Sequence, residues 1–149
     1  MNQKKKSRRY RFALIGLFFP ALGMAQEGPC APALQEACRT AQKLAVAIQK
    51  QLPMKASPQA SLEMAVAEKH VLVVSGRFSF DAEAAKKYFM QSGVTLDQFQ
   101  DRYSQSVKPS LCRPGSETYQ FVRMGGVVEY RYAYSNNDPF MKFGVVRCD

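Results

Sequence analysis

The amino terminus carries the feature that most constrains what this chain can fold into. Residues 1–11 contain six lysines and arginines and no acid, and residues 12–19 form an uninterrupted apolar run. Gly23 and Ala25 then supply small side chains at the two positions that cleavage of an export signal requires. Residues 1–25 therefore predict a cleavable signal peptide, so that the mature chain would fold outside the bacterial cytoplasm, as a periplasmic or secreted protein.

A membrane anchor is the alternative to a signal peptide. The stretch from Phe12 to Ala25 has 14 residues, whereas a spanning helix needs about 20. A lipid anchor would need a cysteine directly after the apolar run, but the first cysteine, Cys30, lies further along the chain. A serine followed by two arginines at residues 7–9 suggests the twin-arginine route, but Arg11 stands where that signal usually has an apolar residue. General secretion is favoured, and no stable membrane anchor is expected after cleavage.

The signal peptide also accounts for most of the positive charge. The chain has 21 lysines and arginines against 12 acids, a net charge of +9. Without the six basic residues of the signal peptide, 15 basic and 12 acidic residues remain, a net charge of +3. The remaining basic residues are scattered, with Lys86-Lys87 as the longest cluster, and none is interleaved with aromatic residues in a basic patch. We therefore expect no nucleic acid partner.

Four cysteines, an even number, remain in the mature chain: Cys30, Cys38, Cys112 and Cys148. Because exported chains fold in an oxidising compartment, two disulfides are expected. A zinc site is the alternative, but the four positions contain no C-x-x-C, and the only histidine, His70, is far from all of them in the sequence. We expect no metal and no cofactor.

Residues 26–149 are enough for a single domain with its own core and too few for two. Between Leu34 and Leu52, apolar side chains recur every three or four residues. This spacing predicts an amphipathic helix that Pro53 ends. Residues 55–58 are interpreted as a connector.

Two strands and two helices are predicted next. Residues 62–66 and 72–80 alternate with a period of two around a turn, which predicts an antiparallel hairpin. An aspartate precedes residues 82–92 and is suited to cap a short helix there. A capping box that starts at Thr95 predicts a second helix over residues 96–107.

From Glu117 onward the sequence alternates with a period of two. Three strands are predicted, over residues 117–123, 128–134 and 140–148, and the short turns between them would make a meander. The order of elements predicts an α+β fold. Its sheet would be roughly five-stranded and antiparallel, a β-hairpin plus a three-stranded meander, stapled by disulfides and packed by about three helices on one face.

The predicted topology also gives an expectation for disulfide connectivity. In a meander, the start of the first strand and the end of the third lie about 20 Å apart, at about 3.3 Å per residue. Cys112 and Cys148 take those two places, whereas a disulfide needs Cα atoms within about 7 Å. A bridge from Cys30 to Cys38 is also awkward, because Cys38 would lie nearly two turns inside the first helix. We therefore expect the two amino-terminal cysteines to link to the two carboxy-terminal ones.

A row of tyrosines in the second meander strand provides the candidate partner-binding residues, Tyr130, Tyr132 and Tyr134. Rings at alternate positions of a strand would present apolar area and hydroxyl groups to a protein or a glycan. The alternative is that the row faces the helices and fills the core. The sequence leaves both interpretations open.

No catalytic motif is present. A serine or cysteine nucleophile normally needs a histidine base, and His70 falls in a predicted hairpin turn together with a lysine and a glutamate. Asp97 and Asp101 share a helix face, but acids near helix starts are expected from the helix dipole alone. Gly125-Gly126 is not part of the G-x-x-x-x-G-K pattern of a phosphate-binding loop, and no helix is predicted directly after it. We expect no catalytic residue and no enzymatic activity.

The distal part of the chain combines Cys112, Gly125-Gly126, Tyr130-x-Tyr132 and a terminal Cys148. This pattern resembles that of small exported bacterial proteins of unknown function. The resemblance implies an exported compartment and a small size, and it implies no activity and no functional residue.

Two function classes follow from these observations. The favoured one is a small exported interaction or accessory protein that binds another envelope or secretion-system protein without catalysis, through a sheet edge or the tyrosine face. The alternative is a small hydrolase of envelope polymers, or an inhibitor of such a hydrolase. A concave pocket with two or more convergent carboxylates would favour the alternative. The sequence does not indicate an oligomeric state.

Overall fold

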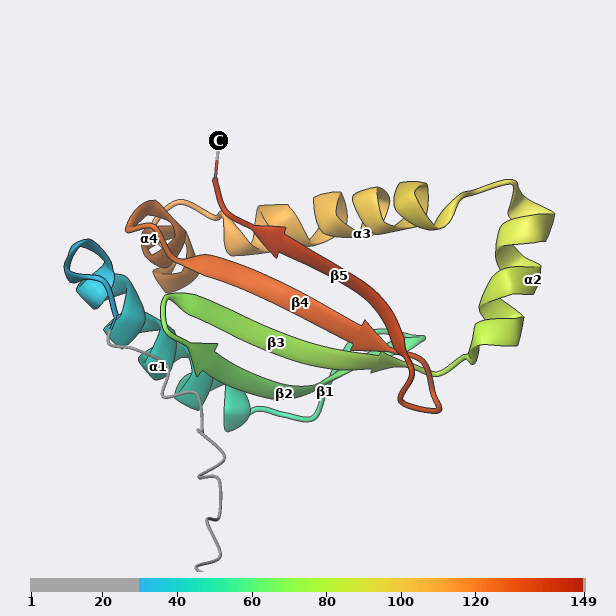
Figure 1. The fold of residues 1–149 in the computed structure, drawn as a ribbon, viewed down its shortest axis with the longest axis horizontal. Coiled ribbons are helices and arrows are strands. Elements are labelled where there is room, and N and C mark those ends of the chain that lie inside the picture. The colour runs from blue at the N-terminus through green and yellow to red at the C-terminus, as the bar shows by residue number, and fades with distance from the viewer. Residues whose placement is uncertain (1–29, 149) are drawn as a thin grey trace, which may run out of the picture.

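The computed structural model describes residues 30–148, which fold around one five-stranded sheet with the strand order β1-β2-β3-β4-β5 (Figure 1). The predicted signal peptide lies outside the described residues. In chain order the elements are the 3-10 turn η1 (Pro32–Leu34), α1 (Gln35–Gln49), β1 (Met54–Ser57), β2 (Ala60–Glu68), β3 (Val71–Phe78), α2 (Ala82–Ser92), α3 (Leu96–Leu111), α4 (Glu117–Arg123), β4 (Val127–Ala133) and β5 (Pro139–Val145). The predicted α+β class with a five-stranded sheet, helices and two disulfides is confirmed.

The first half of the chain follows the predicted pattern closely. Helix α1 packs its buried apolar side chains, among them Ala37, Ala41 and Leu44, against β2 and β3. Strands β2 and β3 form the predicted antiparallel hairpin. The residues predicted to be a connector are instead largely strand β1, which pairs with the start of β2 at the edge of the sheet. This strand was missed because it has only four residues and two of them are exposed.

The predicted meander is wrong, because residues 117–123 form helix α4 instead of a strand. Ser116 caps this helix by accepting a hydrogen bond from the Tyr119 amide at 3.1 Å. The neighbouring side chains of Phe121 and Val122 are both buried, which a half-buried strand does not allow because its successive side chains point to opposite faces. Contacts with α1 thus stabilise a helix over a segment with strand-like alternation.

The sheet is therefore mixed. Strand β4 runs parallel to β3, from the pair Val71 and Val127 onward, and antiparallel to β5. A parallel pair requires a long crossover connection, and α2, α3 and α4 together provide it (Figure 1).

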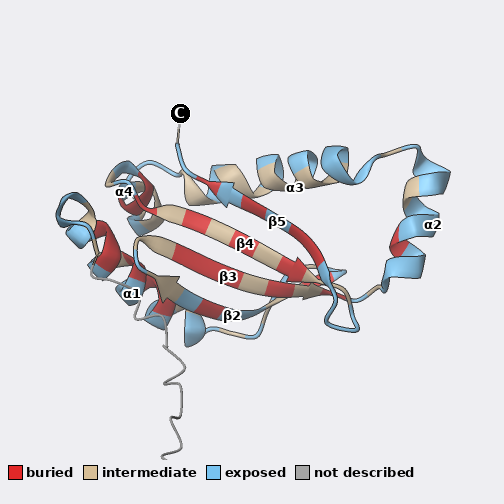
Figure 2. Ribbon diagram, viewed as in Figure 1, coloured by how far each residue is buried: buried red, intermediate tan, exposed pale blue. Residues whose placement is uncertain are grey.

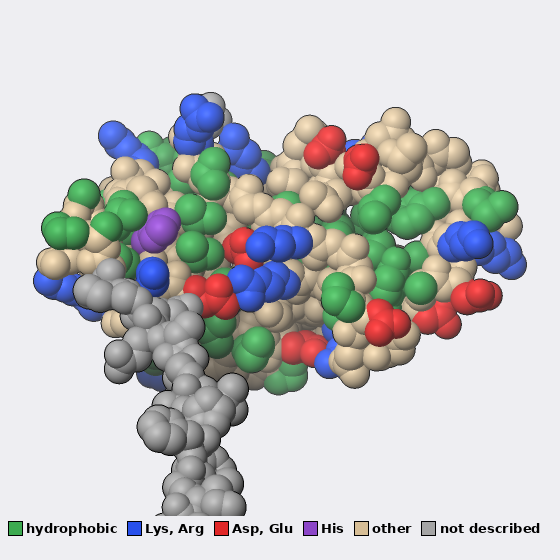
Figure 3. Space-filling model, viewed as in Figure 1, with side chains coloured by type: hydrophobic (Ala, Val, Ile, Leu, Met, Phe, Trp, Pro, Cys, Tyr) green, Lys and Arg blue, Asp and Glu red, His purple; other side chains and the backbone are tan. Residues whose placement is uncertain are grey.

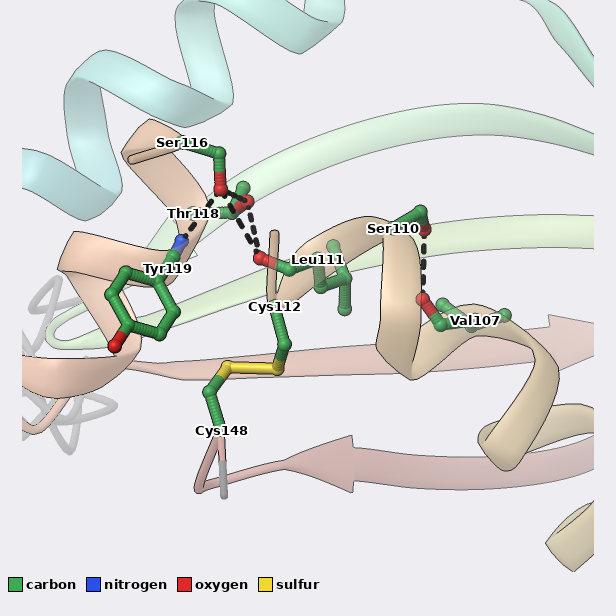
Figure 4. Close-up of a disulfide and its surroundings, with 8 residues drawn as sticks. All are labelled: Val107, Ser110, Leu111, Cys112, Ser116, Thr118, Tyr119 and Cys148. Atoms are coloured by element: carbon green, nitrogen blue, oxygen red, sulfur yellow. Dashed lines mark hydrogen bonds between the residues drawn. A yellow bond between two sulfur atoms is a disulfide. The ribbon is translucent and has the colours of Figure 1, made fainter. Parts of the chain in front are cut away.

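The expected disulfide connectivity is wrong, because each observed bond joins two cysteines that were not expected to pair. Cys30 bonds to Cys38, with Cα atoms 6.6 Å apart, and Cys112 bonds to Cys148, with Cα atoms 5.3 Å apart. The first bridge forms because η1 precedes α1, which puts Cys38 in the first turn of the helix. The second forms because the segment after Cys112 folds as helix α4 and not as the predicted strand. Helix α3 ends beside the end of β5, as Figure 4 shows.

The core lies on the helix side of the sheet, where cross-strand rows of side chains face α1, α3 and α4. The rows run Leu72, Val128, Val145; then Val74, Tyr130, Phe143; then Gly76, Tyr132, Met141. Figure 2 shows burial concentrated along β3, β4 and β5 and on α1 and α4, whereas α2 and α3 are mostly exposed or intermediate. The helix side thus has a tightly packed half under α1 and a looser half under α3.

Candidate functional site

Helix α3 sets the geometry of the candidate site. Its start is fixed by the predicted capping box, in which Thr95 and Gln98 each accept a hydrogen bond from the other's backbone amide. An apolar stripe of Phe99, Tyr103 and Val107 turns toward the sheet, yet none of the residues of α3 is fully buried. The helix contacts β5 and leaves room between itself and β1.

That room is a groove of about 330 Å³, which we call the tyrosine groove. Strand β1 forms one wall, α3 forms the other, and β2 and β4 form the floor. Its lining consists of Ala56, Ser57, Leu62, Tyr103, Ser106, Val107, Ser110, Tyr130 and Tyr132. None of these side chains is charged at neutral pH, so the groove offers apolar surface and hydroxyl groups.

The structure divides the predicted tyrosine row. Tyr130 and Tyr132 are 8% and 3% exposed and pack into the core, as the second interpretation of the row required. The same two side chains also lie at the floor of the tyrosine groove. Tyr134 is partly buried against Phe140, with ring centroids 4.6 Å apart, and it is not part of the groove lining. A partner-binding role for these tyrosines remains a prediction.

A hydrogen bond joins the floor of the groove to its α3 wall. The Tyr103 hydroxyl donates to the Tyr132 hydroxyl at 3.1 Å, and the two rings meet edge to face at 5.3 Å between centroids. Burial raises the pKa of Tyr130 to about 12. Burial and the bond to Tyr103 also raise the pKa of Tyr132. Both phenols therefore stay protonated well above the physiological pH range and add no charge to the groove.

Gly76 shapes the groove floor. A Cβ atom at this position would lie 2.6 Å from the backbone oxygen of Ser61 and 2.6 Å from Cε1 of Tyr132. The Tyr132 ring therefore extends across β3 in space that only a glycine leaves free. The position of the ring, and with it the floor, depends on the absence of a side chain at residue 76.

In residues 30–148, no helix lies on the opposite face of the sheet, and ion pairs cover its middle. Arg131 bonds Glu68 at 2.9 Å and Glu129 at 2.6 Å, and Lys142 bonds Glu129 at 2.9 Å. Burial alone would raise the pKa of Glu129, but hydrogen bonds from Lys142 and Arg131 and their charges lower it below its ordinary value. Figure 3 shows acidic and basic side chains gathered over the middle of this face. These charges are matched within the chain.

The side chains considered for catalysis are not brought together. The only histidine, His70, lies in the turn between β2 and β3, where its carbonyl accepts a hydrogen bond from the Val127 amide at 3.0 Å. Asp97 and Asp101 are exposed on α3. Among residues 30–148, no group of three or more His, Cys, Asp or Glu is placed to hold a metal ion. In the same range, no helix has the length and apolar character to cross a membrane.

The sequence did not reveal the walls of the groove. The α3 wall, with Ser106, Val107 and Ser110, could have been predicted from the sequence, since helix periodicity places these residues on the same side as Tyr103. The β1 wall, with Ala56, was not, because the short strand was interpreted as a connector.

Comparison with known proteins places the fold. No family model and no curated protein matches the sequence. A Pseudomonas aeruginosa protein described as secreted aligns with 78% of this chain and 95% of its own, at 15% identity and a TM-score of 0.59. The pilotin EpsS of the Vibrio vulnificus type 2 secretion system aligns with 78% of this chain and 96% of its own, at 13% identity and a TM-score of 0.58. The pilotin AspS of the Vibrio cholerae type II secretion system aligns with 76% of this chain and 91% of its own, at 15% identity and a TM-score of 0.55. This chain thus shares its fold with two secretion-system pilotins and a protein described as secreted.

Proposed function

We propose that this chain is an exported accessory protein of a bacterial secretion assembly, and that it binds a segment of another protein of that assembly in the tyrosine groove. The observation that carries the proposal is the groove itself: an uncharged hollow, floored by tyrosines, on a fold that is shared with two pilotins of type II secretion systems. The proposed role is binding without catalysis.

Three independent features support export of this chain from the bacterial cytoplasm. Two disulfides staple both ends of the domain, and such bonds are typical of proteins that fold outside the cytoplasm. The amino terminus has the pattern of an export signal. One protein that shares the fold is described as secreted.

The chemistry of the groove defines the segment that would bind there. Tyr130, Tyr132 and Val107 supply apolar surface, and Ser106 and Ser110 supply hydroxyl groups along one wall. Tyrosine is enriched at protein interfaces because it combines a large rigid ring with a hydrogen-bonding group. A volume of about 330 Å³ takes a few side chains, not a whole domain. We infer that a short segment with an apolar, uncharged face is the ligand.

The hydrolase alternative receives no support from the hollows on the surface. The tyrosine groove has no carboxylate in its lining. The hollow on the open face of the sheet includes Glu63 as its one carboxylate, and the hollow beside β5 includes Asp101. Two convergent carboxylates, as hydrolysis of a glycan normally requires, are not found in these three hollows of the described chain.

The proposal is tested by placing a photo-activated cross-linking amino acid at residue 106 in living cells. Ser106 is exposed and lines the groove, so the substitution reaches a bound segment without entering the core. Gln91 is also exposed and lies on α2, and the same amino acid there is the control. We expect a cross-link to one subunit of the secretion assembly from residue 106 only. The same products from both positions, or none from residue 106, would contradict a binding groove.

A further inference from the structure

We propose that the free edge of β5 is a second binding surface, which takes an extended, acidic segment of another protein as a sixth strand of the sheet. This surface is separate from the tyrosine groove, and the proposal does not rest on the function proposed above.

The edge itself is the first observation. Strand β5 is last in the strand order, and its register pairs are all with β4. In the described part of the chain, no strand pairs with its other side. Such an edge presents a row of backbone donors and acceptors to which an extended chain can add.

A hollow of about 450 Å³ lies beside the end of this strand. Strand β5 and the residues after it contribute Gly144, Val145, Val146 and Arg147, and α3 contributes the other wall. The α3 residues in the lining are Asp101, Ser104, Gln105 and Lys108.

Helix α3 therefore separates two hollows. The α3 residues that line the edge hollow are Asp101 and the residues three, four and seven positions after it. Those that line the tyrosine groove are Tyr103 and the residues three, four and seven positions after it. Because each residue turns about 100° around a helix, a displacement of two residues puts the two stripes on opposite flanks. The flank that faces the β5 edge is polar, and its side chains suit the polar face of an added strand.

Two residues of the edge lack an explanation from packing within the chain. A Cβ atom on Gly144 would meet only Val127 at 3.7 Å and the oxygen of Val128 at 3.8 Å, which are ordinary contacts. A glycine inside a strand weakens it and often marks a place where another backbone approaches. Val146, an apolar side chain in the same hollow, is 56% exposed. Both features are explained if another chain covers this edge.

The charged side chains near the β5 edge indicate which kind of segment would bind there. Arg147 lies at the hollow and forms no ion pair with a carboxylate of the described residues. Lys142 lies on β5 and is 62% exposed, but its charge is matched by Glu129. Among the described residues, Asp101 is the one acid in the lining of the hollow. Arg147 therefore favours a segment that carries carboxylates, whereas a second copy of this chain would bring a second Arg147 to the contact.

The test uses the full chain with both disulfides formed and a synthetic peptide as the probe. The peptide has ten residues, alternating threonine and valine, with two aspartates at one end and both termini blocked. In a titration followed by NMR, we expect changes confined to β5 and the polar flank of α3, with slower amide exchange along β5. A peptide methylated at alternate backbone nitrogens should bind at least tenfold more weakly, because several backbone hydrogen bonds are lost.

Two charge variants complete the test. Arg147→Glu should weaken binding of the probe about threefold, as expected for an exposed ion pair. Arg39→Glu, which makes the same change on an exposed position of α1, should leave binding unchanged. Equal binding of the methylated peptide, equal effects of the two variants, changes centred on the tyrosine groove, or pairing of two copies through β5 would each overturn the proposal.

Discussion

Replacement of Gly76 by alanine should distort the floor of the tyrosine groove. The added Cβ would lie 2.6 Å from the Ser61 carbonyl oxygen and 2.6 Å from Cε1 of Tyr132, both too close for real atoms. Because the first contact is with backbone of the neighbouring strand, it cannot be relieved by moving a flexible side chain. Overpacking of this kind costs about 1–3 kcal/mol, and the lower entropy of the unfolded chain returns about 0.4–1 kcal/mol.

We therefore expect Gly76→Ala to be about 1–2 kcal/mol less stable than the wild type in urea unfolding, and its Tm to be about 4–8 °C lower. Gly144→Ala is the matched control, since its Cβ would make only contacts of 3.7 Å or more. This control should be as stable as the wild type or up to about 1 kcal/mol more stable. Equal stability of the two variants would refute the account of the groove floor.

Three further changes test other parts of the structure. Tyr132→Phe removes the hydrogen bond with Tyr103 and should cost about 1 kcal/mol of unfolding free energy in urea; an unchanged midpoint would show that the bond contributes nothing. Glu129→Gln should cost less than about 1 kcal/mol near pH 7, since the partners of Glu129 are half exposed. The pKa of Glu129 in the folded protein lies below its ordinary value of 4.5, so the ionised side chain stabilises the fold fully above pH 4.5. This stabilisation is lost as the pH falls through the folded pKa, and the unfolding free energies of wild type and variant should therefore converge in acid. Loss of the Cys112–Cys148 bond by paired serine substitutions should cost about 1 kcal/mol more than loss of the Cys30–Cys38 bond, since 36 rather than 8 residues separate the cysteines; calorimetry that gave the reverse order would contradict the loop-entropy argument.

Local sequence signals predicted the elements that depend on local contacts. The periodicity of α1, the capping box at Thr95 and the alternation of β2 and β3 all correspond to observed elements. The number of strands was also right, although one predicted strand does not exist and β1 was missed.

The errors arose where tertiary contacts decide the structure. Residues 117–123 alternate like a strand, but burial of both Phe121 and Val122 beside α1 stabilises a helix. Because of this one error, the parallel pairing of β3 and β4 was not predicted and the bond between Cys112 and Cys148 was not expected. The tyrosine row was identified from the sequence, but its lining of a groove depends on α3, which crosses over from a distant part of the chain.

The affinity of the tyrosine groove for its partner is the most direct test of the proposed function. Ser106→Trp would fill the groove from an exposed position, and Gln91→Trp adds the same side chain on α2. Calorimetric titration with the secretion-assembly subunit that is cross-linked from residue 106 should give a Kd at least tenfold weaker for Ser106→Trp and an unchanged Kd for Gln91→Trp. Equal Kd values for Ser106→Trp and the wild type would show that the partner binds elsewhere.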